Sequence, residues 1–328
     1  MTKTLKKLVY RSISLTQCDR LVPYFVRGSL RIINYHGVCE DHLAGEPWMP
    51  PSFITRSNFE WQLRYFSKRG AVLSLAAAMA RLEAGNLPRG AVAITFDDGY
   101  ANNLTLAYPV LKKLGVPATV FLITQCIESG DFFIFDRPRF LDRHRAGGED
   151  PAPLVERFWQ AYRRGPLETA LAESTSWWDQ VSTKISAEQR DSLRPLTVEE
   201  VKNFDPDLVE FGAHTHRHPI LRNEPPDRRA WEIQTSIARV REWTGRPARF
   251  FAYPNGKTGE FDEFDKKVLG SQGIEAAFST NTGFNRKGQD LFECRRIGVG
   301  LYHDADAFIA ETSGLRQLLK MIALQAPG

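Results

Sequence analysis

Two adjacent carboxylates, Asp97 and Asp98, directly follow an apolar run at residues 91–96. Neighbouring carboxylates at the end of a strand repel each other and lose solvation on burial. Such a pair persists most readily where a cation holds one carboxylate and a proton or a water molecule occupies the other. An aspartate at this place can instead cap the helix that follows a strand. The pair alone therefore indicates either a cation site or a helix cap.

A group of histidines follows another apolar run, at residues 208–211. His214 and His218 are four residues apart, so a helical turn would place both imidazoles on one face, with His216 on the other side. Two histidines and one carboxylate are a common ligand set for a catalytic zinc ion that keeps one position open for water. Histidine pairs at this spacing also occur on protein surfaces, so a metal site requires that the two clusters meet.

The two clusters together resemble the polysaccharide deacetylase family, which is also called the NodB-homology or carbohydrate esterase 4 group. Its first motif, T-F-D-D-G, is matched by residues 95–99, and its second, H-[ST]-x-x-H, by residues 214–218. The resemblance implies that Asp97 is the general base. It also implies that Asp98, His214 and His218 bind a divalent metal ion, which we expect to be zinc.

Amide hydrolysis also needs an acid, because the departing amine must be protonated. Most members of the family use a histidine in a late L-x-H motif, for which His303 is the candidate here. A subset that resembles the biofilm poly-N-acetylglucosamine deacetylases carries the acid in an early Tyr-His motif, matched by Tyr35 and His36. We expect His36 to be the acid and keep His303 as the alternative.

The third motif of the family, R-x-P-Y, is altered in this chain. Ala252 takes the place of the arginine and Asn255 that of the tyrosine. Backbone donation to an oxyanion survives such changes because it does not depend on the side chain, so we expect the oxyanion site at Tyr253, Pro254 and Asn255. In the family this arginine orients the base, so the altered motif lacks the orienting cation. Arg296 could supply it from another strand, or it could be a solvated or structural arginine. The tryptophan of the fourth motif is absent.

Strands and helices alternate along the chain, which predicts parallel strands joined by crossover helices. The expected strands lie at residues 29–35, 91–96, 118–123, 208–212, 249–253 and 275–279, and the expected helices at 59–69, 75–83, 103–114, 227–243 and 261–270. Thr197 and Glu200 form a capping box at the start of another helix. The family resemblance implies an α/β fold, a distorted (β/α) barrel of about seven strands, in which the candidate residues meet at the carboxyl ends of the strands.

The alternation is interrupted at residues 131–195, a stretch rich in aromatic and charged residues that includes Phe135, Trp159 and Tyr162. We expect a helical insertion over the open end of the barrel, which either packs there or forms a lid or substrate wall. The expected organisation is a basic N-terminal segment at 1–28, the deacetylase domain at 29–312 and an amphipathic C-terminal helix at 313–328.

Composition agrees with an ordinary globular enzyme, because 42% of the 328 residues are hydrophobic and 25% are charged. The net charge of +4 is too small and too dispersed to indicate nucleic-acid binding. The four cysteines are scattered, as in a chain with reduced thiols. Because no signal peptide follows the N-terminal lysines, we expect a cytoplasmic location. The basic N-terminal segment either packs on the domain or contacts the inner face of the membrane.

The expected function is a metal-dependent deacetylase that removes an N-acetyl group from an amino-sugar glycan or its lipid-linked precursor, as in exopolysaccharide biosynthesis. An O-acetyl esterase, a deformylase or another amidase on the same scaffold is an alternative. A non-catalytic carbohydrate-binding protein is a further alternative, disfavoured because Asp97 and the three candidate ligands are all present.

Overall fold

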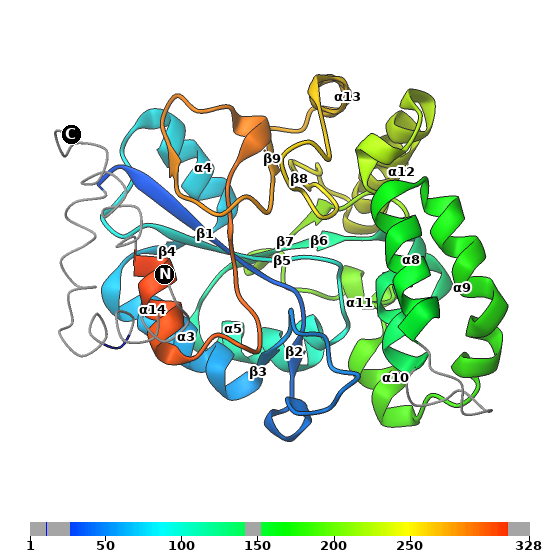
Figure 1. Ribbon diagram of the computed structural model, residues 1–328. Helices are drawn as coiled ribbons and strands as arrows, with labels where there is room; N and C mark the ends of the chain where they lie inside the picture. The colour runs from blue at the N-terminus through cyan, green and yellow to red at the C-terminus, as the bar shows by residue number, and fades with distance from the viewer. Residues whose placement is uncertain (1–10, 12–26, 142–151, 314–328) are drawn as a thin grey trace, which may run out of the picture.

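The computed structural model describes residue 11 and residues 27–141 and 152–313, and Figure 1 shows a curled sheet at its centre. This nine-stranded sheet has the order β10-β1-β5-β6-β7-β8-β9, with β11 paired to β1 and β4 paired to β5. All of its pairs are parallel except that of β1 with β10. The strands are β1 (Ser29–Tyr35), β4 (Val72–Leu73), β5 (Val92–Phe96), β6 (Ala118–Leu122), β7 (Val209–Ala213), β8 (Phe250–Ala252), β9 (Ala276–Phe278), β10 (Asn285–Arg286) and β11 (Ile297–Gly298).

Crossover helices connect the parallel strands, as the alternating pattern predicts. They are α3 (Arg56–Arg69), α4 (Leu75–Ala84), α5 (Tyr108–Leu114), α6 (Thr124–Ser129), α11 (Val198–Lys202), α12 (Pro226–Thr244) and α13 (Glu263–Ser271), followed by α14 (Ala305–Ser313). The six predicted strands appear as β1, β5, β6, β7, β8 and β9, with ends shifted by at most one residue. The prediction of a distorted (β/α) barrel of about seven strands is confirmed, because the main path of the curled sheet, from β10 to β9, holds seven strands.

Sequence signals explain where several helices begin and end. Thr197 and Glu200 form the predicted capping box at the start of α11. Gly115 closes α5 in the left-handed conformation, with φ of 62°. The helix predicted from residue 103 begins instead as a π-helical turn, η3 (Asn103–Ala107). Within and beside this turn, Asn103 donates a hydrogen bond to the His36 carbonyl and Asn102 accepts one from the backbone of Val38. The π-helical turn is therefore the place where this segment contacts the residues that follow β1.

The predicted insertion is helical and forms α8 (Ala152–Arg164), α9 (Leu167–Ser182) and α10 (Ala187–Leu193), preceded by the 3₁₀ helix η4 (Ile134–Phe140). In Figure 1 these green helices stand together beside one end of the sheet. Phe158 and Trp177 of the insertion belong to the same hydrophobic cluster as Phe53 and Tyr100 of the barrel loops. The insertion thus shares a core with the loops that follow the strands.

Two predicted elements fall mainly outside the described residues, namely the basic segment at 1–28 and the C-terminal helix at 313–328. Within the described part of the chain, no helix is both long enough and apolar enough to cross a membrane. Cys39, Cys126 and Cys294 are free thiols.

A short parallel pair of strands, β2 (Val38–Cys39) with β3 (Ile54–Thr55), was not predicted, because two-residue strands show no periodicity.

Candidate active site

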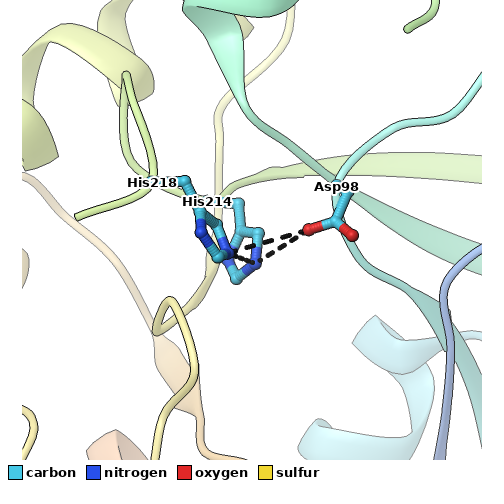
Figure 2. Close-up of side chains that lie close together, drawn as sticks. All are labelled: Asp98, His214 and His218. Atoms are coloured by element: carbon cyan, nitrogen blue, oxygen red, sulfur yellow. Dashed lines mark hydrogen bonds and ion pairs between the residues drawn. The ribbon is translucent and has the colours of Figure 1, made fainter. Parts of the chain in front are cut away.

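The three predicted metal ligands lie together at the carboxyl ends of β5 and β7, as Figure 2 shows. Nε2 of His214 is 3.2 Å from Nε2 of His218. The nearer Asp98 oxygen, Oδ1, is 3.6 Å from the first of these nitrogens and 3.8 Å from the second. All three side chains are buried. Segments more than a hundred residues apart in the chain therefore converge on one point.

The hydrogen bonds of the two histidines fit a cation between them. Nδ1 of His214 is 2.7 Å from the Ala252 carbonyl, which can only accept, so this nitrogen carries the proton. Nδ1 of His218 is 2.7 Å from the Tyr162 hydroxyl. Burial lowers the pKa of His214 to about 4, and burial together with the neighbouring His214 lowers the pKa of His218 well below its usual value. Two neutral imidazoles thus direct Nε2 toward a carboxylate, a donor set that suits zinc.

The loop that carries these histidines is not the helical turn that their spacing predicted. Residues 214–218 have no helical assignment, and Thr215 and His218 adopt φ of 63° and 66°. Asp98 and Asn255, with φ of 73° and 54°, are the other described non-glycine residues with positive φ. Left-handed backbone at such residues is uncommon and costs on the order of 1–3 kcal/mol each. All four positions lie at the candidate site, where tertiary contacts must hold them.

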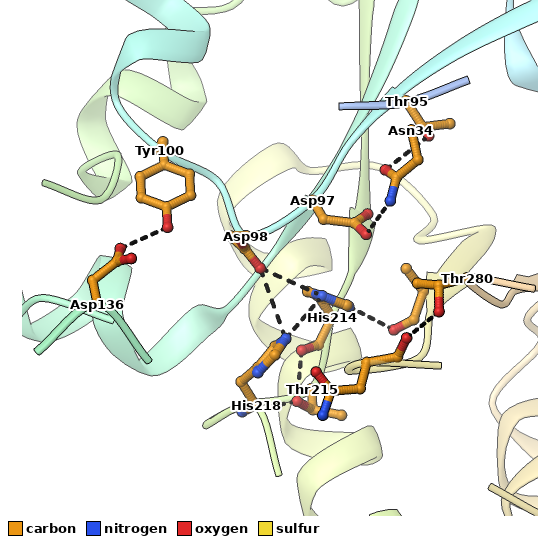
Figure 3. A network of polar contacts seen from close by, with 12 residues as sticks. Asn34, Thr95, Asp97, Asp98, Tyr100, Asp136, His214, Thr215, His218 and Thr280 are labelled. Atoms are coloured by element: carbon orange, nitrogen blue, oxygen red, sulfur yellow. Dashed lines mark hydrogen bonds and ion pairs between the residues drawn. The ribbon is translucent and has the colours of Figure 1, made fainter. Parts of the chain in front are cut away.

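Asp97 lies beside the ligand cluster, and Figure 3 shows its hydrogen bond to Asn34. Its carboxylate accepts two hydrogen bonds from the Arg296 guanidinium, at 2.6 and 2.8 Å, and a third from Asn34 Nδ2 at 2.9 Å. Arg296 also donates to the carbonyl of Ser279 at 3.0 Å and is fully buried. Arg296, which the sequence offered as a candidate to orient the base, therefore lies directly against Asp97 and immediately precedes β11.

The two neighbouring carboxylates differ in their electrostatics. Burial by itself would raise the pKa of the Asp97 carboxyl, but the Arg296 guanidinium, with a further contribution from His214, holds that pKa well below its usual range. Burial and then the charge of Asp97 raise the pKa of the Asp98 carboxyl well above its usual value. Asp97 is thus ionised with a cationic partner inside the protein, whereas ionised Asp98 requires a cation from outside.

His36 follows β1 and lies close enough to Asp97, His214 and His218 to influence their pKa values, whereas His303 has partners elsewhere. Burial lowers the pKa of His36 against the opposing effect of the Asp97 carboxylate. Nδ1 of His36 is buried and has no hydrogen-bond partner among the described residues. His303 instead accepts a hydrogen bond from the Gly300 backbone and lies 3.2 Å from a carboxylate oxygen of Glu311 on α14.

The turn after β8 contains the predicted oxyanion residues. The Tyr253 side chain stacks on Phe261 and its hydroxyl donates to the Phe292 carbonyl, while its backbone N–H donates to the Phe278 carbonyl. Pro254 has no N–H. Among the described residues, none accepts a hydrogen bond from the Asn255 backbone N–H. Of the three predicted residues, only Asn255 offers an uncommitted backbone donor.

Two polar residues of the site escaped the sequence analysis. Asn34 is the second-last residue of β1, and this place near the carboxyl end of a parallel strand is the signal that could have identified it. Tyr162 comes from the insertion, where the sequence shows only one aromatic residue among many. A separate buried pair stands next to the site, because the Tyr100 hydroxyl donates to buried Asp136 of η4 at 2.6 Å (Figure 3).

Comparison with known proteins agrees with this arrangement. The family model described as polysaccharide deacetylase matches residues 84–276. The poly-beta-1,6-N-acetyl-D-glucosamine N-deacetylase of Staphylococcus epidermidis is 32% identical over 117 residues, which are 33% of this chain and 40% of that protein. The alignment with another curated relative, from Bacillus subtilis, spans only 33% of that protein's length. The curated relatives are therefore matched over well under half of their own length.

Solved structures share the fold over most of the chain. A deacetylase of Streptococcus pyogenes, PplD, solved in complex with acetate, superposes with a TM-score of 0.60 at 19% identity and covers 87% of this chain and 98% of that one. IcaB from Ammonifex degensii superposes with a TM-score of 0.58 at 20% identity, covering 87% and 97%. The family model spans more than half of the chain, including both the Asp97-Asp98 pair and the His214–His218 loop, so this chain belongs to the polysaccharide deacetylase family.

Proposed function

We propose that this protein is a metal-dependent N-deacetylase that hydrolyses the acetamido group of an N-acetylated amino-sugar polymer. The observation that carries the proposal is the placement of an ionised, arginine-paired carboxylate, Asp97, directly beside the buried Asp98, His214 and His218 cluster. A carbohydrate-binding protein has no evident need for a charged pair buried beside a candidate cation site. The names of the relatives support N-acetylglucosamine polymers as substrate.

Asp98, His214 and His218 would hold the metal ion, with zinc as the expected cation. When bound by these residues, a divalent cation would supply Lewis-acid chemistry toward the acyl oxygen and would lower the pKa of the attacking water. Asp97 accepts a proton from this water as the water attacks the acyl carbon. Because its pKa is low, Asp97 is a weak base, and the main contribution of Arg296 is to keep the carboxylate ionised and fixed in orientation.

The remaining steps need an oxyanion donor and an acid. The free backbone N–H of Asn255 donates to the oxygen on which negative charge develops. His36 protonates the nitrogen of the departing amine, whose basicity far exceeds that of an imidazole. The lowered pKa of His36 makes its protonated form a stronger acid toward this nitrogen. The products are acetate and a free amino sugar. A cytoplasmic location and a lipid-linked substrate stay predictions from the sequence.

Acetate release from β-1,6-linked N-acetylglucosamine oligomers tests the proposal directly. Zinc-loaded wild type is compared with zinc-loaded Asp97→Asn, and the metal content of both is measured. We expect acetate release by the wild type and a loss of about 10²–10⁴-fold in the variant. Equal release by the two proteins, or none by the wild type, contradicts the proposed activity on these oligomers. An O-acetylated sugar tested in parallel distinguishes an esterase.

A further inference from the structure

Tyr162 of the insertion contacts a candidate metal ligand through two hydrogen bonds. Its hydroxyl is 2.7 Å from Nδ1 of His218 and 2.9 Å from the carbonyl oxygen of the same residue. The side chain is 3% exposed, so water does not compete for these contacts. A hydroxyl has one proton, and the carbonyl can only accept it. The hydroxyl therefore donates to the carbonyl and accepts a hydrogen bond from Nδ1–H.

This arrangement determines which nitrogen of His218 is free to bind a metal. With the proton on Nδ1, the lone pair of the ring lies on Nε2. Nε2 is the atom that lies 3.2 Å from His214 Nε2 and 3.8 Å from Asp98 Oδ1. The other tautomer would place a proton at this point of convergence and would exclude a cation. The Tyr162 hydroxyl thus selects the tautomer that can act as a ligand.

The same hydroxyl also supports an unusual backbone. His218 has φ of 66°, a conformation that residues with a β-carbon rarely adopt. Its N–H donates to Thr215 Oγ1 at 3.0 Å and its carbonyl accepts the proton of Tyr162. Both the N–H and the carbonyl of His218 are therefore hydrogen-bonded, and the partner of the carbonyl comes from the insertion.

The insertion docks against this loop at further points around Tyr162. The backbone carbonyl of Arg163 accepts a hydrogen bond from Asn223 at 3.1 Å. The backbone N–H of Leu167 donates to the Glu224 carboxylate at 2.6 Å. Glu168 pairs with Arg217, the residue before His218, at 2.8 Å. Three contacts therefore attach the corner between α8 and α9 to residues 217–224.

We propose that Tyr162 is a positioning residue of the metal site, which fixes the tautomer, ring orientation and backbone of His218 from the insertion. This inference rests on the metal site of the proposed function and concerns affinity for the ion, not turnover. The alternative is that Tyr162 only packs, since its ring stacks on Phe158 with planes 7° apart. A phenylalanine at this position keeps the packing and removes the two hydrogen bonds, so it separates the two possibilities.

The experiment measures zinc dissociation constants by competition with a chromophoric chelator for the wild type, Tyr162→Phe and Glu168→Gln. We expect the dissociation constant of Tyr162→Phe to rise by about 10–100-fold, as for other outer partners of histidine ligands. Glu168→Gln is the matched control, because it weakens the same corner through a half-exposed ion pair that touches no ligand. Its dissociation constant should stay within about twofold of the wild-type value.

Two further measurements separate this inference from its alternatives. Thermal unfolding of the metal-free proteins shows whether Tyr162→Phe still folds, and ¹⁵N chemical shifts of metal-free His218 should report the Nδ1–H tautomer in the wild type and a mixture in the variant. Zinc binding by Tyr162→Phe that equals the wild type overturns the inference, as does a wild type that binds no zinc. If the wild type binds zinc tightly and Tyr162→Phe does not, but no acetate is released, the inference stands and the proposed function fails.

Discussion

Arg296 and Asp97 form a bidentate ion pair, with both guanidinium nitrogens between 2.6 and 2.8 Å from the two carboxylate oxygens. The pair is almost completely buried, since the arginine is 0% and the aspartate 2% exposed. It joins the residue before β11 to the residue after β5, two strands that both pair with β1. Because a buried carboxylate is stabilised only by well-placed partners, the geometry of this arginine controls the ionisation and the orientation of Asp97, the candidate base.

Replacing Arg296 by lysine should separate the effect of charge from that of geometry. Lysine keeps the positive charge but cannot form two parallel hydrogen bonds with one carboxylate. We expect the rate of acetate release to fall by about 10–100-fold through misorientation of Asp97, with zinc content unchanged. Steady-state kinetics of the zinc-loaded variant check this. Arg296→Met serves as a comparison, because leaving the carboxylate unpaired should cost about 3–5 kcal/mol of stability. Wild-type kinetics in the lysine variant would show that the fork geometry is unimportant.

The choice between His36 and His303 as acid leads to a second prediction. We expect His36→Gln to reduce acetate release from N-acetylated oligomers by about 10²–10⁴-fold. His303→Gln should have little effect, because His303 is engaged with Gly300 and Glu311. The loss in His36→Gln should be much smaller with an aryl acetate, whose phenolate leaves without protonation. A large loss in His303→Gln alone would instead identify His303 as the acid.

The candidate base and metal ligands could be predicted, because their residue types and spacing form short motifs that are visible in the sequence. Asp97, Asp98, His214 and His218 each follow an apolar run, and parallel strands bring such ends to one rim. The strands themselves were equally visible, since buried parallel strands are continuous apolar runs.

The partners of these residues depend on tertiary register. From the sequence, Arg296 could be named only as a candidate partner of Asp97, and Asn34 was not predicted. Asn34 and Arg296 meet Asp97 only because β1 lies between β5 and β11, and β11 is too short to show a pattern. The helical turn expected at the second motif was wrong, because local propensity cannot foresee a left-handed His218 that Thr215 and Tyr162 hold in place.

Zinc binding should be visible as thermal stabilisation, which requires no substrate. A ligand at about 100 times its dissociation constant adds about 2.7 kcal/mol to the stability of the folded state, which corresponds to a rise in Tm of about 5 °C. His214→Ala should abolish this shift. His216→Gln should retain it, because His216 contacts Thr124 and Trp231 and lies outside the ligand cluster. Differential scanning calorimetry with and without chelator provides the measurement. An equal zinc-dependent shift in His214→Ala would exclude the proposed ligand set.

Glu210 leads to a pH prediction at a position away from the active site. It lies on β7 and lines a cavity at the amino-terminal ends of the strands, together with Arg246 and Arg249. Burial raises the pKa of Glu210 to about 7, despite the opposing charge of Arg249. Arg249 is also paired with Glu275, at 2.7 Å. This pairing limits how far the charge of Arg249 lowers the pKa of Glu210.

The sign of the effect follows from proton binding. Between the unfolded pKa of Glu210, near 4.5, and its folded value of about 7, the folded protein holds a proton that the unfolded chain releases. The stability contribution is therefore fully present below pH 4.5 and is lost as the pH rises to 7. Since Glu210 is only half-buried, we expect the free energy of unfolding to fall by about 1–3 kcal/mol over this pH range.

Glu210→Gln removes this pH dependence. The free energy of unfolding of the variant should therefore increase relative to that of the wild type between pH 5 and pH 8. Urea unfolding of both proteins at the two pH values tests this, because titration of the shared metal ligands cancels in the difference. A difference that is the same at both pH values would show that Glu210 titrates normally in the folded protein.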